Sequence, residues 1–578
     1  MVIKNIQSYY NGTNSSIASL FENFLKLNDP NISRLISSIP FDFSTIVSET
    51  RNKYKNEKTI RNFENNHITD IQLHENRINL STKVKKFHSN AHTLTENVNN
   101  INDLLVDSNT KIHLSIHQPN LFAYSGVFKK IIFLQMLKQM LLKDDPFLKI
   151  VNLFVIIDND FLNNIWTRNA QLPSMNHNSG IFELKLPFNN NKRWKTLNNI
   201  PKPNEALLYR WKSDIIKWIR SNSENMSPSE RNKLTNNFKS LWKHVEISFE
   251  DSKNYADFNS FIISRITNLE FEYDTLFVRL TDIIPLLENG YRYILSNAEN
   301  YTKSIMSIEF LFKRNEIPLA VSSNTHIYAP FWINCECGGK SHSIIEKNIT
   351  KEDKDVDEIK LSGTCLSCKN KLEINITRQE NISDGLAKLS PRAIPIMLLL
   401  KYGLDFDCLA SGTGGSIKYT AISSKVFNDL SIKMPDVFIW PASDKYIGIG
   451  QKHAEKIKEE LEVDVLDEHI RILRYKEDEY KNKIFPKIEE REKIFRNDVG
   501  KFTELEKKEI LEELFILKEE QRTIRKRSST INKIRNCLAL KPCIIDYAVN
   551  FGLTKTRDTW QNELINNNML DIPITFNT

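Results

Sequence analysis

The fold is decided by the stretch IHLSIHQPN at residues 112–120. Its first five residues predict a buried strand, which ends at the polar turn formed by residues 117–120. A helix with an apolar face is predicted at residues 127–142, and a second β-rich run, LKIVNLFVII, occupies residues 148–157. Strand, helix and strand in this order, with polar residues after each strand, indicate a βαβ unit of a parallel sheet.

Polar side chains follow both predicted strands. His117, Gln118 and Asn120 come after the first strand, and Asp158 and Asp160 come after the second. Ligands of open α/β sheets bind beyond the carboxyl ends of the strands. We therefore expect these five side chains to share one site.

Length and composition limit the class of protein. The chain has 578 residues, which suggests three or four structural units. Hydrophobic residues make up 40% of the chain and exclude a wholly disordered or fibrous protein. The formal charge of +7 is small for this length and does not by itself indicate a nucleic-acid binder. The sequence contains no apolar run of membrane-spanning length and its beginning lacks a signal core, so we expect a cytoplasmic protein with no membrane partner.

Four of the seven cysteines fall in one window, as Cys335-Glu336-Cys337 and Cys365-Leu366-Ser367-Cys368. Two closely spaced thiol pairs can close a tetrahedral zinc site, and Gly338 and Gly339 supply the backbone freedom that such a turn needs. His342 is an alternative ligand. Four thiolates leave no open coordination position, so we expect a structural zinc ion in a ribbon. Buried thiols are predicted for Cys408, Cys537 and Cys543.

Two further stretches stand out in the second half of the chain. The densest glycine cluster, SGTGGS at residues 411–416, precedes a predicted helix at residues 419–430. Backbone N–H groups at such a helix start could bind an anion, although glycine turns also serve as plain connections. Residues 451–536 are rich in Lys, Glu and Arg, with apolar residues at helical spacing, which predicts a helical hairpin or an antiparallel coiled coil. A coiled coil would allow a homodimer.

The sequence contains motifs that resemble those of two protein families. Residues 115–130, SIHQPNLFAYSGVFKK, resemble the opening motif of the WbqC-like proteins of bacterial polysaccharide clusters, and the resemblance continues at residues 158–161 and 166–169. The order of features along most of the chain is more similar to the bacillithiol biosynthesis cysteine-adding enzyme family. The counterparts of that family's motifs are Gln118, residues 158–161 (DNDF), residues 389–392 (LSPR), residues 414–419 (GGSIKY) and Met434-Pro435.

The second resemblance implies an α/β fold with a Rossmann-like parallel-sheet core of the class I synthetase and nucleotidyltransferase type. It also implies a ligase that joins an amino acid, cysteine in the family, to a small amine acceptor such as a glucosaminyl-malate. The zinc ribbon departs from the family pattern, in which a simple hairpin stands at this place. His117 replaces a small residue and Ser416 replaces an acidic one. These departures leave room for a different amino acid or acceptor.

With this resemblance the chain divides into seven segments. They are an N-terminal helical region (residues 1–110), the first half of a Rossmann-like core (111–204), a helical connective region (205–325), a zinc-ribbon insert (326–380), the second half of the core with the glycine loop (381–450), an antiparallel coiled coil (451–536) and a C-terminal segment that returns to the core (537–578).

Amide formation needs an activated carboxyl group, a nearby amine and stabilisation of developing negative charge. Of the candidate catalytic residues, His117 would contact a phosphate of ATP or another nucleotide, and Gln118 and Asn120 would orient a polar substrate. Asp158 or Asp160 would bind or deprotonate an ammonium group. The candidate substrate-binding residues are Tyr124, Arg168, Asn169, Arg392, Gly412, Gly414, Gly415, Ser416, Lys418 and Tyr419.

Each residue also has a plain structural interpretation. Asp158 and Asp160 could cap a helix start, His117 could satisfy a buried carbonyl group, and Arg392 could close a salt bridge. Two other functions stay open: a WbqC-like aminoacyl or acyl transferase of sugar or polysaccharide metabolism, and an RNA-binding protein that uses the ribbon and the coiled coil. We expect small-molecule substrates rather than a nucleic-acid partner, because the predicted coiled coil carries charges of both signs.

Overall fold

The computed structural model describes residues 29, 42–59, 70–187, 189, 192–315, 328–347, 358–377, 385, 388–412, 416–440, 444–461, 485–494, 496, 503–566 and 574–576. Within the predicted N-terminal helical region, the helices are α4 (Phe43–Thr59), α5 (Asp70–Asn90) and α6 (Glu96–Asp103). Residues 1–28 and 30–41 lie outside the described residues.

A five-stranded parallel sheet forms the core. The two predicted strands are β1 (Lys111–His117) and β2 (Ile150–Ile156), and the predicted helix between them is α7 (Ser125–Asp144). The other strands are β5 (Leu276–Arg279), β11 (Cys408–Ser411) and β12 (Asp436–Ile439), in the spatial order β12-β11-β1-β2-β5. When the five strands are numbered along the chain and read from β5 to β12, the order is 3-2-1-4-5, which is that of doubly wound α/β sheets. The predicted α/β class and parallel sheet are therefore confirmed.

Side chains alternate between the two faces of this sheet. On β2, Val151, Leu153 and Val155 join one apolar core, and Ile150, Phe154 and Ile156 join the other. One face is covered by α4, α7, α9 (Glu205–Asn222), α10 (Pro228–Asp251), α11 (Tyr255–Arg265), α21 (Ile544–Phe551) and α22 (Leu553–Asn566). The other face is covered by α5, α6, α12 (Leu280–Ile283), α13 (Glu288–Ser296), α14 (Ala298–Arg314), α16 (Pro395–Leu404) and α17 (Ser416–Asp429).

Strand β5 lies inside residues 205–325, which the sequence pattern describes as a helical connective region. It has only four residues, Leu276-Phe277-Val278-Arg279, between helical segments. A strand this short is too brief for its alternation to stand out from a helical apolar face. The segment therefore supplies an edge strand of the core as well as helices.

A second, antiparallel sheet follows the connective helices. Its strands are β6 (Tyr328–Asn334), β7 (Lys340–Lys347), β8 (Glu358–Thr364), β9 (Lys371–Thr377) and β10 (Leu389–Pro391), in the order β10-β6-β7-β8-β9. Between the two cysteine pairs, β7 and β8 pair as antiparallel neighbours. β10 pairs with β6, so the Ser390-Pro391 motif belongs to this second sheet and not to the core.

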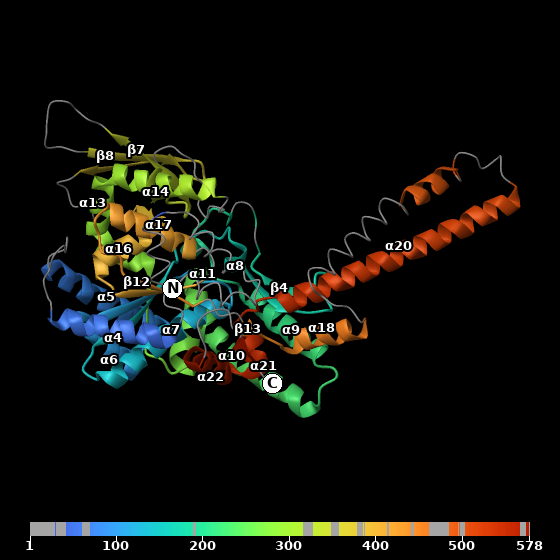
Figure 1. The fold of residues 1–578 in the computed structure, drawn as a ribbon, viewed down its shortest axis with the longest axis horizontal. Helices are drawn as coiled ribbons and strands as arrows, with labels where there is room; N and C mark the ends of the chain where they lie inside the picture. The colour runs from blue at the N-terminus through green and yellow to red at the C-terminus, as the bar shows by residue number, and fades with distance from the viewer. Residues whose placement is uncertain are drawn as a thin grey trace.

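The charged C-terminal region contains α18 (Ile449–Glu460), a helical segment at residues 485–494 and the long α20 (Glu504–Ala539). Figure 1 shows α20 extending away from the rest of the molecule, with the helical residues 485–494 beside its far end. Ion pairs join the two segments, from Arg491 to Glu513 at 3.0 Å and from Lys518 to Glu492 at 2.6 Å. A helical C-terminal region is therefore present, as predicted.

One short helix and two strand pairs complete the fold. They are α8 (Ile165–Arg168), the antiparallel pair of β3 (Asn169–Pro173) and β4 (Ile181–Lys185), and the parallel pair of β13 (Asp444–Lys445) and β14 (Ile574–Thr575). Among the helices that the structure describes, none combines the length and the apolar character needed to cross a membrane.

Candidate functional site

The candidate site lies where the strand order of the core sheet reverses. β1 is flanked by β11 on one side and by β2 on the other, and the connections after β1 and β11 cover opposite faces. At such a switch point the two loops diverge and leave space beyond the strand ends. The loop after β1 begins at Gln118, the loop after β2 contains Asp158 and Asp160, and Gly412 follows β11.

His117 is the last residue of β1 and is half-buried. Its Nδ1 lies 2.9 Å from the carbonyl oxygen of Gln118, so Nδ1 carries the proton and donates it. Burial lowers the pKa of His117 to about 3, and the charge of Lys130 acts in the same direction. The ring is therefore neutral, and its Nε2 can accept a hydrogen bond from the Tyr124 hydroxyl, 3.4 Å away.

Gln118 and Asp160 connect the loops after β1 and β2. The Gln118 side-chain amide donates to Oδ2 of Asp160, and the backbone N–H of Phe161 donates to Oδ1 at 2.8 Å. Asp160 is thereby held in one orientation while staying half-buried. The sequence prediction placed these two residues at one site, and the structure brings their side chains into contact.

Asn120 is buried, with 1% of its surface exposed. Neither polar atom of its side chain has a hydrogen-bond partner in the described part of the chain. Burying an unsatisfied amide is unfavourable, so such groups usually meet a ligand or an ordered water. Asn120 also lies beside Tyr124: burial raises the pKa of the Tyr124 hydroxyl, and Asn120 acts in the opposite direction.

Phe122 fixes the conformation of this loop. Its backbone is left-handed, with φ of 44°, which is a strained conformation for an aromatic residue. The ring is almost fully buried and packs against Trp211 at 5.7 Å, Trp242 at 6.2 Å and Phe258 at 6.3 Å between ring centroids. The aromatic cluster thus holds a strained loop whose neighbouring residues are Asn120 and Tyr124.

Tyr124 lies between His117 and Trp166. Its ring is 5.9 Å from the His117 ring and 5.8 Å from the ring of Trp166, which is 44% exposed. The C-terminal segment returns to this point, because the backbone N–H of Ile544 donates to the carbonyl of Ala123 at 2.9 Å.

Asp158 has a structural role in this arrangement. It is fully buried, and its carboxylate accepts hydrogen bonds from the backbone N–H of Thr281, at 3.1 Å, and from the Thr281 hydroxyl. Thr281 is in the first turn of α12, so Asp158 satisfies a free N–H at a helix start. Burial raises the pKa of Asp158 to about 6. These contacts match the capping interpretation, and they leave Asp160 as the acidic group better placed for a substrate.

The glycine loop approaches the site next to Lys130. A Cβ at Gly412 would lie 3.3 Å from Cε of Lys130, whose ammonium donates to the carbonyl of Ile116 at 3.3 Å. Burial lowers the pKa of Lys130 to about 8. Gly414 and Gly415 lie outside the described residues, and Ser416 and Lys418 are placed only as backbone of α17.

Two side chains from other elements lie near enough to Asp160 for its charge to affect their pKa values. Tyr419, in the first turns of α17, is half-buried, and the negative charge of Asp160 contributes to raising its pKa after burial. Lys340, the first residue of β7, is 2% exposed and lies over the Phe161 ring, 5.2 Å from its centroid. Burial lowers the pKa of Lys340 to about 8, opposed by the charges of Asp160 and Asp158.

For three other predicted substrate-binding residues, the described contacts involve neither His117 nor Asp160. Arg168 donates to the carbonyl groups of Asn163, at 2.9 Å, and Leu162. Asn169 lies on β3 opposite Lys185. Arg392 stacks over the ring of Trp332 at 5.1 Å, on the ribbon side.

The four clustered cysteines come together as predicted. Their Sγ atoms all lie within 4.8 Å of one another, with Cys335 3.6 Å from Cys368 and Cys337 3.7 Å from Cys365. Thiolates on a tetrahedral zinc ion with bonds of about 2.3 Å are separated by about 3.8 Å. The geometry is therefore compatible with structural zinc. The predicted buried thiols Cys408, Cys537 and Cys543 are also confirmed.

The cysteine cluster is linked to the site through one loop. The carbonyl of Gly338 accepts a hydrogen bond from the backbone N–H of Thr196 at 3.0 Å. The next two residues, Leu197 and Asn198, donate their backbone N–H groups to the carbonyls of Asp160 and Asp158, each at 2.9 Å. Backbone hydrogen bonds of residues 196–198 thus connect the turn that carries Cys337 to the acidic loop at residues 158–161.

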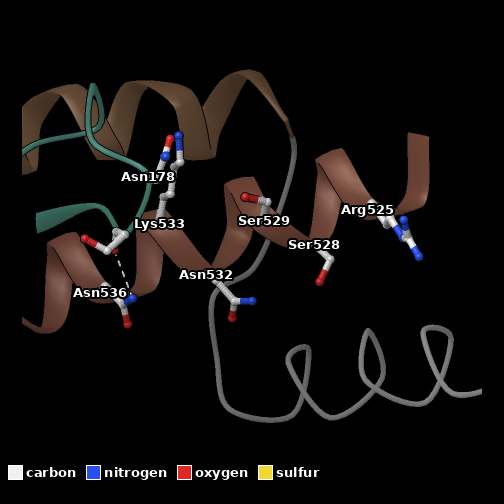
Figure 2. A pocket seen from close by; sticks show the side chains of 8 residues that line it. Asn178, Arg525, Ser528, Ser529, Asn532, Lys533 and Asn536 are labelled. Carbon is white, nitrogen blue, oxygen red and sulfur yellow. Dashed lines mark hydrogen bonds between the residues drawn. The ribbon is translucent and has the colours of Figure 1, made fainter. Parts of the chain in front are cut away.

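A polar cavity of about 350 Å³ lies at the base of α20, away from the predicted site residues. Figure 2 shows part of its lining: Arg525 and Lys533 come from α20, and Asn178 comes from the turn between β3 and β4. The turn packs tightly on the helix: Gly180 has φ of 76°, and a Cβ there would lie 2.2 Å from the carbonyl oxygen of Lys533. None of the predicted site residues lines this cavity.

Lys130, Phe161 and Lys340 join the site without having been selected from the sequence. Lys130 and Phe161 belong to quoted motifs, but nothing in a single sequence distinguishes a site lysine from a surface one. Lys340 is some 180 residues from Asp160, and its only signal is its place three residues after Cys337.

No protein-family model matches the chain, and no curated protein matches it.

Proposed function

We propose that this protein is a ligase-like enzyme that forms a C–N bond between an amino acid and a small amine acceptor. The observation that carries the proposal is the convergence of His117, Gln118, Asp160 and Tyr419 at the switch point of a doubly wound sheet. Sites at this place in α/β sheets bind polar small molecules. The resemblance to the bacillithiol cysteine-adding enzymes supplies the reaction class.

The side chains suit the two reactants of such a reaction. The Asp160 carboxylate, held by Gln118 and the Phe161 N–H, can bind an ammonium group or accept its proton. The buried Lys130 can donate to the oxygen atoms of a carboxylate or phosphate. The neutral His117, whose Nδ1 donates to the Gln118 carbonyl, can accept a hydrogen bond from a substrate at Nε2. The buried Asn120 amide beside Tyr124 can orient a polar group.

The four-cysteine cluster is proposed to hold one structural zinc ion. The donor set is four thiols at tetrahedral separation, which leaves no position for substrate. We propose that ATP or another nucleotide activates the carboxyl group. The doubly wound core is the feature that favours a nucleotide. The cytoplasm is the proposed compartment.

The proposal is tested with purified full-length protein, ATP and a panel of amino acids and amine acceptors that includes cysteine and glucosaminyl-malate, with products followed by mass spectrometry. We expect an amide product that is reduced at least about 100-fold in His117→Ala and Asp160→Asn. Asp214→Asn is the matched control, because Asp214 lies on α9 and pairs only with exposed Arg210 and Lys217 among its described contacts.

The other possible results distinguish the ligase from the alternative function or refute the site assignment. Transfer of an acyl group to a sugar acceptor without use of ATP would replace the ligase by the WbqC-like transferase. Full activity in both site variants would refute the site assignment, and absence of any product from the panel would refute the ligase.

A further inference from the structure

Lys340 occupies an unusual position for a lysine of a cysteine ribbon. It follows the turn that contains Cys337, Gly338 and Gly339, yet only 2% of its surface is exposed. Its ammonium lies over the ring of Phe161, 5.2 Å from the ring centroid. Phe161 directly follows Asp160, so the Lys340 side chain reaches the loop after β2.

The charge of Lys340 has no close counter-ion among the described residues. Both Asp160 oxygens already accept hydrogen bonds, from Gln118 and from the Phe161 N–H. The Asp158 carboxylate is engaged by Thr281. For a lysine buried to this extent, an aromatic face and two more distant carboxylates are weak partners, and another anion would complete the surroundings of its ammonium.

The ribbon holds Lys340 rigidly in this place. The Lys340 carbonyl accepts a hydrogen bond from the N–H of Leu366, within the second cysteine turn, at 2.9 Å. Lys340 pairs with Asn334 across β6 and β7, and on the same strand β6 the ring of Trp332 packs on Phe161 at 5.3 Å. Both cysteine turns thus position the lysine, and the aromatic contact joins the ribbon to the loop that carries Asp160.

We propose that Lys340 is a substrate-binding residue, which the cysteine ribbon places at the candidate site to bind a carboxylate or phosphate group of the substrate. The inference rests on the location of the proposed active site and deepens it. It gives the ribbon a role in substrate binding in addition to its own folding. The ammonium would meet the anionic group while the neighbouring Asp160 remains available for a cationic amine.

The test is calorimetric titration of the full-length, metal-loaded protein with two probes, pyrophosphate and succinate. We expect one of the two to bind, and its Kd to weaken at least about tenfold in Lys340→Met, as for loss of one charge-assisted hydrogen bond. Lys340→Arg should stay within about threefold, because the positive charge is retained. Lys371→Met is the matched control, since Lys371 is exposed on β9 of the same ribbon.

The two probes identify the source of the anion. Binding of pyrophosphate indicates a nucleotide or an activated phosphate, and binding of succinate indicates a carboxylate substrate. Metal content measured on every variant shows that the ribbon has folded. Lys340→Met with full metal content and unchanged binding would overturn the inference, as would binding of neither probe to the parent protein.

These results are distinguishable from failure of the ligase proposal. Anion binding that depends on Lys340 without any amide product would leave Lys340 in the site and refute only the ligase reaction. An amide product that is unaffected in Lys340→Met would support the ligase and exclude Lys340.

Discussion

At the scale of single residues, the loop after β1 combines a strained backbone at Phe122 with residues of the candidate site. Phe122 has a left-handed backbone and a buried ring, and it lies between the two site residues Asn120 and Tyr124. Strained residues of this kind persist where surrounding packing over-determines them, and they cluster at functional sites. The aromatic cluster under Phe122 therefore sets the geometry of the site as well as the stability of the core.

This view gives a prediction for two phenylalanines of one cluster. Phe122→Leu and Phe258→Leu should each lower the stability by about 1–3 kcal/mol, because both remove part of a packed ring. Only Phe122→Leu should also reduce turnover or probe binding by about tenfold or more, since only Phe122 belongs to the site loop. Urea unfolding and calorimetric titration measure the two effects, and equal functional loss in both variants would contradict the assignment.

Asp546 provides a second residue-scale prediction. It is fully buried, accepts a hydrogen bond from Asn550 at 2.8 Å, and has a pKa raised by burial to about 8. The unfolded chain releases this proton near pH 4, so between about pH 4 and pH 8 the folded state binds more protons. This group alone should therefore make stability fall as pH rises through that window, by up to about 1.4 kcal/mol per pH unit.

The measurement is urea unfolding at pH 5 and pH 8 for the parent protein and for Asp546→Asn. The variant cannot ionise, so its decrease in stability between the two pH values should be smaller than that of the parent. An identical pH dependence in both proteins would show that Asp546 does not titrate in this range.

At the scale of elements, the proposed zinc ribbon would be a metal-dependent support for the candidate site. Its two cysteine turns hold Lys340, and the first of them contacts the loop of Thr196 that also binds the acidic loop. A structural four-thiolate zinc site supplies much of the folding free energy of a small ribbon. Loss of metal should therefore disorder both the ribbon and the lysine that it carries.

The prediction concerns Cys335→Ser combined with Cys337→Ser. We expect metal content to fall from one equivalent per chain to below about 0.2, β6–β9 to become sensitive to protease, and probe binding to weaken as in Lys340→Met. Plasma mass spectrometry, limited proteolysis and calorimetry provide the readouts. Ser367→Ala in the second turn, which removes no thiol, is the control. Retention of full metal content in the double variant would contradict the four-cysteine site.

At the scale of the whole molecule, two buried histidines join the N-terminal helices to the sheet. His88 on α5 accepts a hydrogen bond at Nε2 from the backbone N–H of Phe277 on β5, at 2.9 Å. His113 on β1 lies 2.9 Å from the hydroxyl of Tyr54 on α4. Burial lowers the pKa of each histidine to about 3. Both are neutral in the folded state, and the α5 and α4 contacts depend on that neutrality.

Acid should therefore weaken the attachment of these helices. An unfolded histidine binds its proton near pH 6.5, so stability is fully present above that pH and is lost as pH falls from about 6.5 to 3. Each histidine contributes up to about 1.4 kcal/mol per pH unit in that range. His113→Gln should move the acid transition to lower pH, while substitution of the exposed His92 should leave it unchanged. Tryptophan fluorescence during an acid titration measures the transition, and coincident curves would contradict the prediction.

The sequence by itself determined the parts of this protein that depend on local pattern. The strand at residues 112–116, the helix at 127–142 and the β-rich run at 148–157 are confirmed as β1, α7 and β2, because strand and helix periods are written in neighbouring residues. The close spacing of the cysteine pairs likewise predicted their cluster. The positions of Gln118 and Asp160 after parallel strands were enough to predict that they would meet.

Only the tertiary structure decided which residues distant in the sequence join these elements and the candidate site. The four residues of β5 became a core strand through pairing with β2, which no local period indicates. Asp158 and Asp160 look alike in the sequence, yet one is engaged by Thr281 of α12 and the other by Gln118. Lys340 reaches the site because the ribbon folds against the loop of Thr196. The physical reason is the same in each case: long-range packing chooses among side chains that local patterns leave equivalent.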